Sequence, residues 1–248
     1  MTLRRIIVGD VHGHYEALIM LMQEIAPNKN EPVYFLGDLI DRGPHSSQVV
    51  DFVKTHHYHC LLGNHEQMLL EVLGTHKPAG EAFQGWLYSG GYSTLLSYNH
   101  RIPQQHIDWF KTLPLYLDLG DIWLVHAGVD PDMLLFDQSA TQFCWIRDEF
   151  HSMTEPYFSD KLIITGHTIT FTFPGVEPGQ LVRGAGWLDI DTGAYHPYSN
   201  WLTALDVTNN LVYQVHTQDK TLRKLPLDEI SVQIKPDQVQ AKRLQQTS

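Results

Sequence analysis

The sequence predicts an α/β protein in which two β-sheets pack face to face, with helices on their outer faces. In the first third of the chain, short apolar runs alternate with segments of helical periodicity, and each run ends in Gly-Asp or Gly-Asn. In the last third, short apolar runs follow one another with turn residues between them. The chain has 248 residues, of which 43% are apolar, enough to bury a sizeable core. We expect a single domain over residues 1–248.

The first third predicts a βαβαβα succession, which favours parallel strands joined by crossover helices. The expected strands are 3–8, 32–36 and 58–62, because each is a short apolar run that stops at a glycine. Helical spacing of apolar residues predicts helices at 15–25 and 46–54, and residues 66–73 are expected to form the first part of another helix.

The remainder of the chain divides into an insertion and a strand-rich region. Residues 75–112 are rich in glycine and aromatic residues, with a helix expected at 104–112, and we expect them to cap the first half. Strands are predicted at 115–119, 122–125, 162–165, 186–190, 202–207 and 211–216, and a helix at 138–150. Thr208-Asn209-Asn210 predicts a hairpin turn between the last two strands. The polar tail after about Asp228 is expected to be loosely held.

Composition limits the partners and the compartment. The net charge of −11 argues against a nucleic-acid backbone as partner, although bound metals could still attract phosphate. No apolar run is long enough to cross a membrane, and the start lacks the pattern of a signal peptide. Cys60 and Cys144 form no CxxC pair, so we expect buried thiols and a cytoplasmic location. The oligomeric state is left open.

Potential metal ligands follow five of the predicted strands. The carboxyl ends of parallel strands meet at one edge of a sheet, so these side chains should converge there. They are Asp10, His12, Asp38, Asn64, His126 and His167. Taken singly, Asp10, Asp38 and Asn64 could each cap the following helix, but the joint pattern with three histidines favours a metal site.

The ligand types predict the metals and the reaction. Carboxylate, amide oxygen and imidazole together suit two divalent ions, most of all Mn²⁺, with Fe or Zn²⁺ as alternatives. Asp38, in the central motif, is our candidate for the bridging carboxylate. Two ions about 3.5–4 Å apart would hold a bridging water or hydroxide and clamp phosphate oxygens for in-line attack. The sequence therefore predicts a phosphoester hydrolase.

Five motifs in order carry a resemblance to a known family: GDVHG (9–13), GDLIDRG (37–43), GNHE (63–66), HAG (126–128) and GHT (166–168). The chain resembles the phosphoprotein phosphatase branch of the calcineurin-like metallophosphoesterases, in particular its bacterial and phage members. The stretch 189–194 is similar as well. The resemblance implies a calcineurin-like four-layer sandwich of two mixed sheets flanked by helices, with the metal site at the carboxyl ends of the strands.

The resemblance also implies roles for single residues. The first metal would be bound by Asp10, His12, Asp38 and His167, and the second by Asp38, Asn64 and His126. His65 would be the general acid that protonates the leaving group, and Asp41 would hold its imidazole. Arg42 would bind the phosphate, and Arg147 is a second candidate for that role.

Within this family two substrate classes compete. The first interpretation is hydrolysis of phosphoserine and phosphothreonine in proteins by direct attack of the metal-bridging hydroxide. The alternative is a bis(5′-nucleosyl)-tetraphosphatase or another small-molecule phosphatase, whose members commonly have Ala-Arg-Gly and Gly-Asn-His-Asp in place of the motifs around Asp41 and Glu66. Those two residues favour the protein phosphatase. A binding module without activity should have lost a ligand or the acid, and all are present here.

Other conspicuous side chains are assigned structural roles. We expect His56, His57 and His59 to lie on the surface, opposite the site. Trp86, Tyr88 and Tyr92 are interpreted as the core of the cap in preference to a substrate platform. Asp191 is expected to support the turn at Gly193.

Overall fold

The computed structural model describes residues 3–74 and 80–239. The strands are β1 (Ile6–Val8), β2 (Val33–Phe35), β3 (His59–Cys60), β4 (Tyr116–Asp118), β5 (Ile122–Val125), β6 (Leu162–Thr165), β7 (Leu181–Arg183), β8 (Trp187–Asp189), β9 (Trp201–Asp206), β10 (Leu211–His216), β11 (Leu222–Pro226) and β12 (Ser231–Gln233). They form two six-stranded sheets, in the orders β11-β10-β9-β1-β2-β3 and β12-β7-β8-β6-β5-β4.

The helices are α1 (Tyr15–Ile25), α2 (Ser46–Thr55), α3 (Asn64–Gly74), α4 (Glu81–Trp86), α5 (Tyr92–Ser97), α6 (Gln104–Phe110), α7 (Ala140–Trp145), α8 (Asp148–His151) and α9 (Leu227–Ile230). Short helical turns lie at Leu87–Gly91, Leu135–Asp137 and Thr170–Thr172. None of the helices within the described ranges has the length and apolar character needed to span a membrane.

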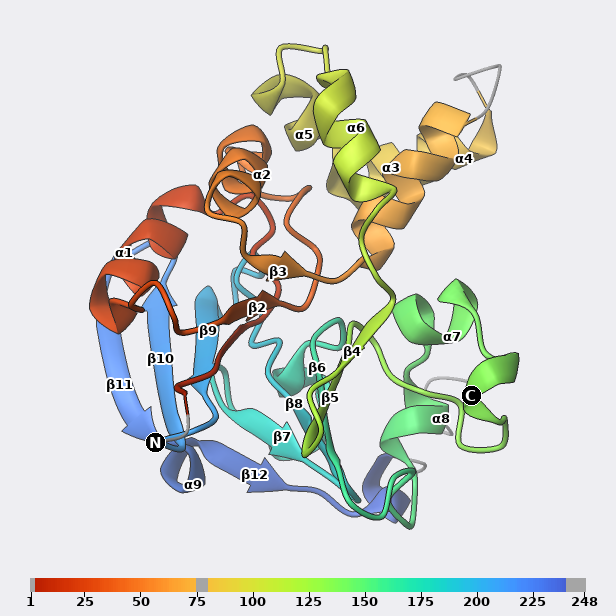
Figure 1. Ribbon diagram of the computed structural model, residues 1–248, viewed down its shortest axis with the longest axis vertical. Helices are drawn as coiled ribbons and strands as arrows, with labels where there is room; N and C mark the ends of the chain where they lie inside the picture. The colour runs from red at the N-terminus through yellow and green to blue at the C-terminus, as the bar shows by residue number, and fades with distance from the viewer. Residues whose placement is uncertain (1–2, 75–79, 240–248) are drawn as a thin grey trace.

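The side-chain alternation along β1 shows how the layers arise. Ile6 and Val8 point to a core shared with α1 and α2, whereas Ile7 points to a second core between the two sheets. A third core, around Trp123 and Phe150, lies between the second sheet and α7–α8. Helix, sheet, sheet and helix layers result, as predicted (Figure 1).

Both sheets are mixed. β1, β2 and β3 pair in parallel, and β1 pairs antiparallel with β9, with Ile7 opposite both Tyr34 and Leu205. In the second sheet β5, β6 and β8 run parallel. The carboxyl ends of β1, β2, β3, β5 and β6 are therefore free to carry the site, and β9 and β10 form the predicted antiparallel pair around Asn209.

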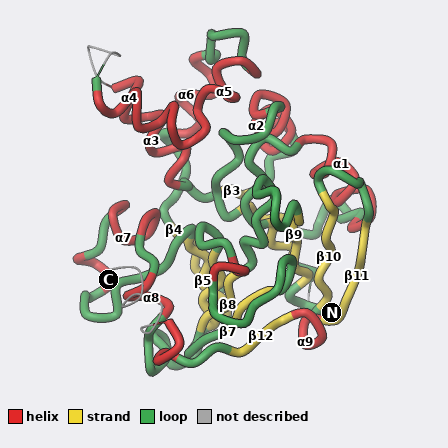
Figure 2. The backbone as a smooth tube through the Cα atoms, turned by 180° about the vertical axis from the view of Figure 1, so that it is seen from behind, coloured by secondary structure: helices red, strands yellow, loops and turns green. Residues whose placement is uncertain are grey.

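Residues 80–112, which we call the cap, contain α4, α5 and α6. These helices lie together beside α3 at one end of the molecule, in both views (Figures 1 and 2). Residues 75–79 of the predicted insertion fall outside the described residues. The buried side chain of Trp86 belongs to the core, as predicted, but Tyr88 is 93% exposed and Tyr92 58% exposed, so that interpretation is wrong for these two tyrosines.

Two predictions of elements were wrong. The helix expected at 138–150 is broken into α7 and α8, because the backbone leaves the helical conformation at Ile146 and Arg147. The tail expected to be loose after Asp228 instead forms α9 and then β12, which pairs in parallel with β7. Ile234 and Val239 are buried there, which explains why this part is held. Residues 240–248 lie outside the described residues.

Candidate metal centre

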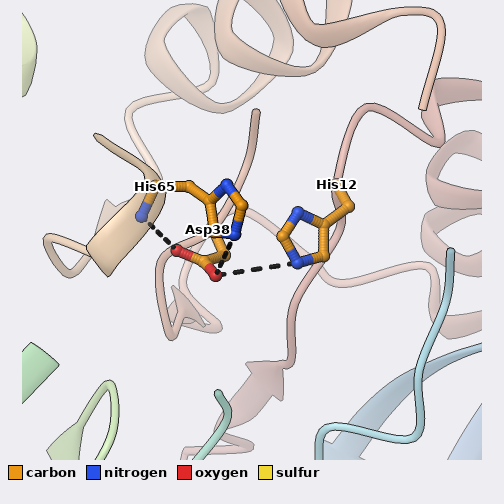
Figure 3. Close-up of side chains that lie close together, drawn as sticks. All are labelled: His12, Asp38 and His65. Atoms are coloured by element: carbon orange, nitrogen blue, oxygen red, sulfur yellow. Dashed lines mark hydrogen bonds and ion pairs between the residues drawn. The ribbon is translucent and has the colours of Figure 1, made fainter. Parts of the chain in front are cut away.

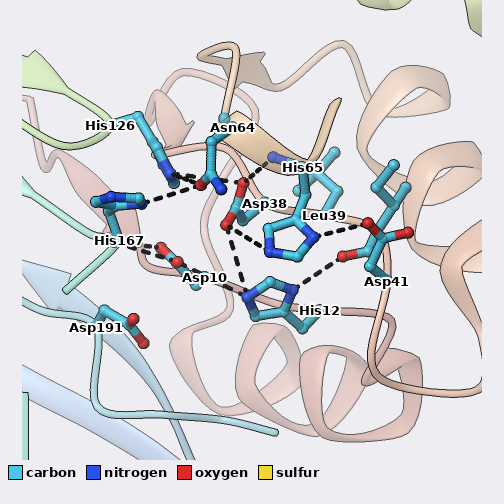
Figure 4. A network of polar contacts seen from close by, with 12 residues as sticks. Asp10, His12, Asp38, Leu39, Asp41, Asn64, His65, His126, His167 and Asp191 are labelled. Carbon is cyan, nitrogen blue, oxygen red and sulfur yellow. Dashed lines mark hydrogen bonds and ion pairs between the residues drawn. The ribbon is translucent and has the colours of Figure 1, made fainter. Parts of the chain in front are cut away.

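The six predicted ligands come together at one edge of the two sheets. Asp10 and His12 follow β1, Asp38 follows β2, and Asn64 begins α3, which follows β3. His126 and His167 follow β5 and β6. All six side chains are buried, with exposed fractions of 5% or less. Figure 4 shows them converging from these separate segments.

Asp38 lies at the centre of this group. Its Oδ2 is 3.6 Å from Nε2 of His12, and its Oδ1 is 3.5 Å from Nε2 of His126. The amide oxygen of Asn64 lies 2.9 Å from Nε2 of His126 and 3.0 Å from Nδ1 of His167. Two sets of side chains could each hold an ion, and they share Asp38: His12, Asp38 and His65, and Asp38, His126 and His167. This arrangement agrees with a bridging role for Asp38.

The buried charges fit divalent cations. Burial, and after it the charges of Asp191 and Asp38, raise the pKa of Asp10. Burial together with Asp38 also raises the pKa of Asp191 to about 7. A cluster of buried carboxylates is costly unless cations neutralise it. The imidazole of His12 is oriented to bind metal, because its Nδ1 contacts the Ile40 carbonyl at 2.9 Å and leaves Nε2 facing the carboxylates.

The histidines divide into two electrostatic classes. Burial lowers the pKa of His12 to about 3 and also lowers that of His126, so both rings are neutral, as metal ligands must be. For His65 burial also opposes the charge, but the carboxylates of Asp38 and Asp41 outweigh it and raise the pKa. Such a division is typical of a site that assigns one ring to proton donation.

His65 stands between two carboxylates. Its Nδ1 lies 2.7 Å from Oδ2 of Asp41, and its Nε2 lies 3.9 Å from Oδ2 of Asp38 (Figure 3). The first contact is the one that the predicted role of Asp41 requires. The second places Nε2 among the ligands, so distance alone would also allow His65 to bind metal. Its role as general acid stays a prediction.

The loop after β2 is held in an unusual backbone conformation. Asp38, Asp41 and Arg42 have φ angles of 48°, 70° and 67°, in the left-handed region that residues other than glycine seldom adopt. The buried carboxylate of Glu66 stabilises this loop by accepting N–H bonds from Asp38, Leu39 and Ile40. Sequence reasoning used Glu66 only as a family signature and missed this role.

Glycine at position 63 serves the same loop. A Cβ atom there would overlap the Asp38 carboxylate, and the Gly63 N–H donates to Oε2 of Glu66 at 3.1 Å. The glycine before Asn64 therefore makes room for the Asp38 carboxylate.

The two predicted phosphate-binding arginines make different contacts at the site. The guanidinium of Arg42 lies 4.8 Å from the centre of the Tyr195 ring. That of Arg147 donates to the His167 carbonyl at 3.1 Å and to the Thr168 hydroxyl at 3.0 Å. Both line a cavity of about 180 Å³, and its walls also include His12, Asp38, Asn64 and His65.

The cavity has walls that sequence reasoning did not predict: Met68, Ser89, Trp145, Asp191 and Tyr195. Asp191 accepts the Gly193 N–H at 2.9 Å, as expected, but it also faces the site (Figure 4). The stretch 189–194, similar to the family, was the signal that could have found Asp191 and, one residue beyond it, Tyr195. His56, His57 and His59 are exposed, as predicted.

Comparison with known proteins places the chain in a family. The family model of the calcineurin-like phosphoesterases matches residues 3–215, and the chain belongs to this family of phosphoester hydrolases. It is 29% identical over 164 residues to the symmetrical bis(5′-nucleosyl)-tetraphosphatases of Klebsiella pneumoniae and Salmonella arizonae. That match covers 63% of this chain and 54% of each relative, so the chain spans about half the length of these curated relatives.

Solved structures confirm the fold. A cold-active protein-tyrosine phosphatase of a Shewanella species matches with a TM-score of 0.59 and 17% identity, covering 91% of this chain and 81% of that one. A serine/threonine protein phosphatase from Saccharomyces cerevisiae matches with a TM-score of 0.56 and 17% identity, covering 90% and 79%. At this identity the likeness shows the fold and does not select a substrate.

Proposed function

We propose that the protein removes phosphate from phosphoserine and phosphothreonine in other proteins, as a two-metal phosphomonoesterase. The observation that carries this proposal is the buried contact between Asp41 and His65, at 2.7 Å. A serine or threonine alkoxide is a poor leaving group and needs a proton as the P–O bond breaks. An imidazole held by a buried carboxylate is suited to supply it.

Asp10, His12, Asp38, Asn64, His126 and His167 would hold two divalent ions, for which Mn²⁺ is our first choice. When bound, such ions supply positive charge to the phosphate oxygens and activate water for attack. Arg42 and Arg147 bind the remaining phosphate oxygens through charge-assisted hydrogen bonds. As the water oxygen bonds to phosphorus and the ester P–O bond breaks, Nε2 of His65 donates its proton to the serine or threonine oxygen. The attacking water gives up a proton to the solvent, and His65 regains one from the solvent before the next cycle. Asp41 holds the ring at Nδ1 throughout.

A second candidate is hydrolysis of dinucleoside tetraphosphates, which the names of the curated relatives favour. Its leaving group is a nucleotide phosphate, a weaker base than an alkoxide, so the reaction depends less on an acid. Proton donation by the Asp41–His65 pair would then contribute less to the rate. For this reason we rank it second.

One experiment decides between the candidates. The protein is stripped with a chelator and reloaded with Mn²⁺, Zn²⁺ or Mg²⁺, and kcat/KM is measured for phosphoserine, phosphothreonine and phosphotyrosine peptides and for diadenosine tetraphosphate. We expect Mn²⁺ to restore activity best, because Mg²⁺ prefers oxygen ligands and keeps its waters. Phosphoserine and phosphothreonine peptides should react with the highest kcat/KM. A tenfold preference for diadenosine tetraphosphate would establish the second candidate, and full activity in excess chelator would refute the two-metal site.

A further inference from the structure

The carboxylate of Asp41 is fixed by side chains of the cap. It has no exposed surface. Its Oδ2 receives the indole N–H of Trp86 at 2.9 Å, in addition to Nδ1 of His65, and its Oδ1 receives the hydroxyl of Thr94 at 2.6 Å. Both cap residues are buried, and they lie 45 and 53 residues away from Asp41 in the sequence. Both carboxylate oxygens are therefore tied to the cap.

These bonds fix both the orientation of the Asp41 carboxylate and the position of its backbone, and the orientation of the His65 ring depends on both. Rotation of the carboxylate would break the bond to Trp86 or the bond to Thr94. The backbone N–H of Asp41 is also held, by the Thr94 hydroxyl at 2.8 Å and the Ser46 hydroxyl at 3.1 Å. With Oδ2 fixed, the His65 ring keeps its Nδ1 on Asp41 and its Nε2 toward the cavity (Figure 4).

The cap backbone is built around the Trp86 indole. The turn Leu87–Gly91 follows directly, and a Cβ atom at Gly91 would overlap the indole ring. In the same turn the Gly90 carbonyl accepts the backbone N–H of Arg42 at 3.2 Å. The segment that contacts the phosphate-binding arginine is thus the one that carries the indole to Asp41.

We propose that Trp86 and Thr94 are positioning residues, which hold Asp41 so that His65 delivers its proton to the leaving oxygen. The cap then acts in the chemical step, beyond closing over the cavity. This inference rests on the proposed role of His65 as general acid. If Trp86 served packing alone, its loss would affect all substrates alike, whereas a positioning role makes the loss depend on the leaving group.

The test uses Trp86→Phe, which removes the indole N–H, and Thr94→Val, which removes the hydroxyl at similar volume. On a phosphoserine peptide each should lower kcat about tenfold, with KM and metal content unchanged, in line with the usual effect of a supporting hydrogen bond. On 4-nitrophenyl phosphate, whose leaving group needs little protonation, the loss should stay below about twofold. Thr94→Ser, which keeps the hydroxyl, should restore activity on the peptide.

Trp187→Phe is the matched control. Trp187 is as buried as Trp86, at 1% exposure, and its indole nitrogen has no hydrogen-bond partner among the described residues. The Trp187→Phe variant loses the same atoms from a buried core as Trp86→Phe does. Its kcat should change by the same factor on the phosphoserine peptide and on 4-nitrophenyl phosphate. Should Trp86→Phe fail to fold, Thr94→Val and Thr94→Ser carry the test alone.

A double-variant cycle completes the experiment. In a His65→Asn background, Trp86→Phe and Thr94→Val should cause no further loss on the peptide, because the residue they act through is gone. An additive loss, or an equal loss on both substrates, would overturn the inference. If His65→Asn itself impairs both substrates equally, the proposed general acid is wrong and the inference is overturned with it. Dependence on the leaving group in His65→Asn but not in the cap variants would overturn the inference alone.

Discussion

The two halves of the molecule contribute to the cavity in different ways. The first half, residues 6–74, supplies four of the predicted metal ligands together with Asp41, Arg42 and His65. Its loops are braced by Glu66 and, through the cap, by Trp86 and Thr94. The second half, residues 116–239, supplies His126 and His167 at the ends of adjacent parallel strands, and Arg147 from the break between α7 and α8.

This difference separates the functions of the two halves. The proposed proton donor and the residues that hold it belong to the first half and the cap. The second half offers two predicted metal ligands and Arg147, whose guanidinium donates to the backbone carbonyl of one of them, His167. Substitutions in the first half should therefore be able to separate catalysis from metal binding and from stability, whereas those in the second half should alter them together.

The largest effect should come from Asp38→Asn, because Asp38 joins the ligands of both halves. Its carboxylate oxygens lie 3.6 Å from His12 and 3.5 Å from His126. We expect the variant to lose bound metal and to lower kcat/KM by about 10³-fold or more, a loss of about 4 kcal/mol in transition-state stabilisation. Phosphoserine peptide and 4-nitrophenyl phosphate should be affected equally, and the check is metal content per chain with kinetics on both.

Asp108→Asn, at an exposed position on α6, serves as its control and should leave both quantities unchanged. Full metal content in Asp38→Asn would show that the halves bind their ions independently, and the shared-carboxylate arrangement would then be wrong.

A comparison of the two arginines sharpens the contrast. Among the described residues, Arg42 makes no side-chain hydrogen bond and lies over the Tyr195 ring, whereas Arg147 bonds to the His167 carbonyl and the Thr168 hydroxyl. Each alanine variant should lower kcat/KM about 10–100-fold, since a hydrogen bond to a charged group is worth about 1.5–3 kcal/mol. Only Arg147→Ala should also lower the melting temperature, by several degrees.

Thermal unfolding and kinetics on the same preparations check this expectation. Arg42→Lys and Arg147→Lys keep the charge without the planar fork, and they show how much of each loss depends on bidentate binding. Equal melting temperatures for the two alanine variants would contradict the division between the halves.

The candidate ligands could be located from the sequence because each lies within a few residues after a strand. A short apolar run ending in Gly-Asp or Gly-Asn marks both the strand and the polar residue at its carboxyl end, so β1, β2 and β3 were predicted together with the candidate ligands that follow them. The same local rule selected His126 and His167. The four-layer fold followed from the order of these elements and from the family resemblance, and the family match confirms it.

The parts that were missed depend on contacts distant in the sequence. Nothing near Trp86 or Thr94 indicates that they meet Asp41, because the contact exists only once the cap folds over the loop. The break at Arg147 is of the same kind, since its guanidinium is drawn to His167 and Thr168, 20 and 21 residues away. β12 is held by a parallel partner about 50 residues earlier, so its polar sequence alone suggested a loose tail.

The smallest effect concerns Asp191, which follows β8 in the second half and interacts with the carboxylates of Asp10 and Asp38 in the first half. In the metal-free protein, burial and Asp38 raise the pKa of Asp191 to about 7, although the Gly193 N–H opposes this. The unfolded chain loses this proton near pH 4 and the folded chain near pH 7, so between these values the unfolded state binds fewer protons. The free energy of unfolding must then fall as the pH rises from about 4 to 7. For this single proton the free energy of unfolding falls by at most about 1.4 kcal/mol per pH unit within that range.

Asp191→Asn isolates this contribution, because the amide oxygen can still accept the Gly193 N–H but cannot ionise. Chelator-treated wild type and variant are unfolded with denaturant at pH 5, 6, 7 and 8, with the exposed Asp219→Asn as control. The variant should be the more stable at pH 8, and the difference should shrink toward pH 5, where folded wild-type Asp191 is protonated and neutral. Added Mn²⁺ should remove the advantage, because the ions neutralise the same carboxylates. If the free energies of unfolding of wild type and variant changed in parallel with pH, the carboxylates of the first half would not raise the pKa of Asp191, and the prediction would be wrong.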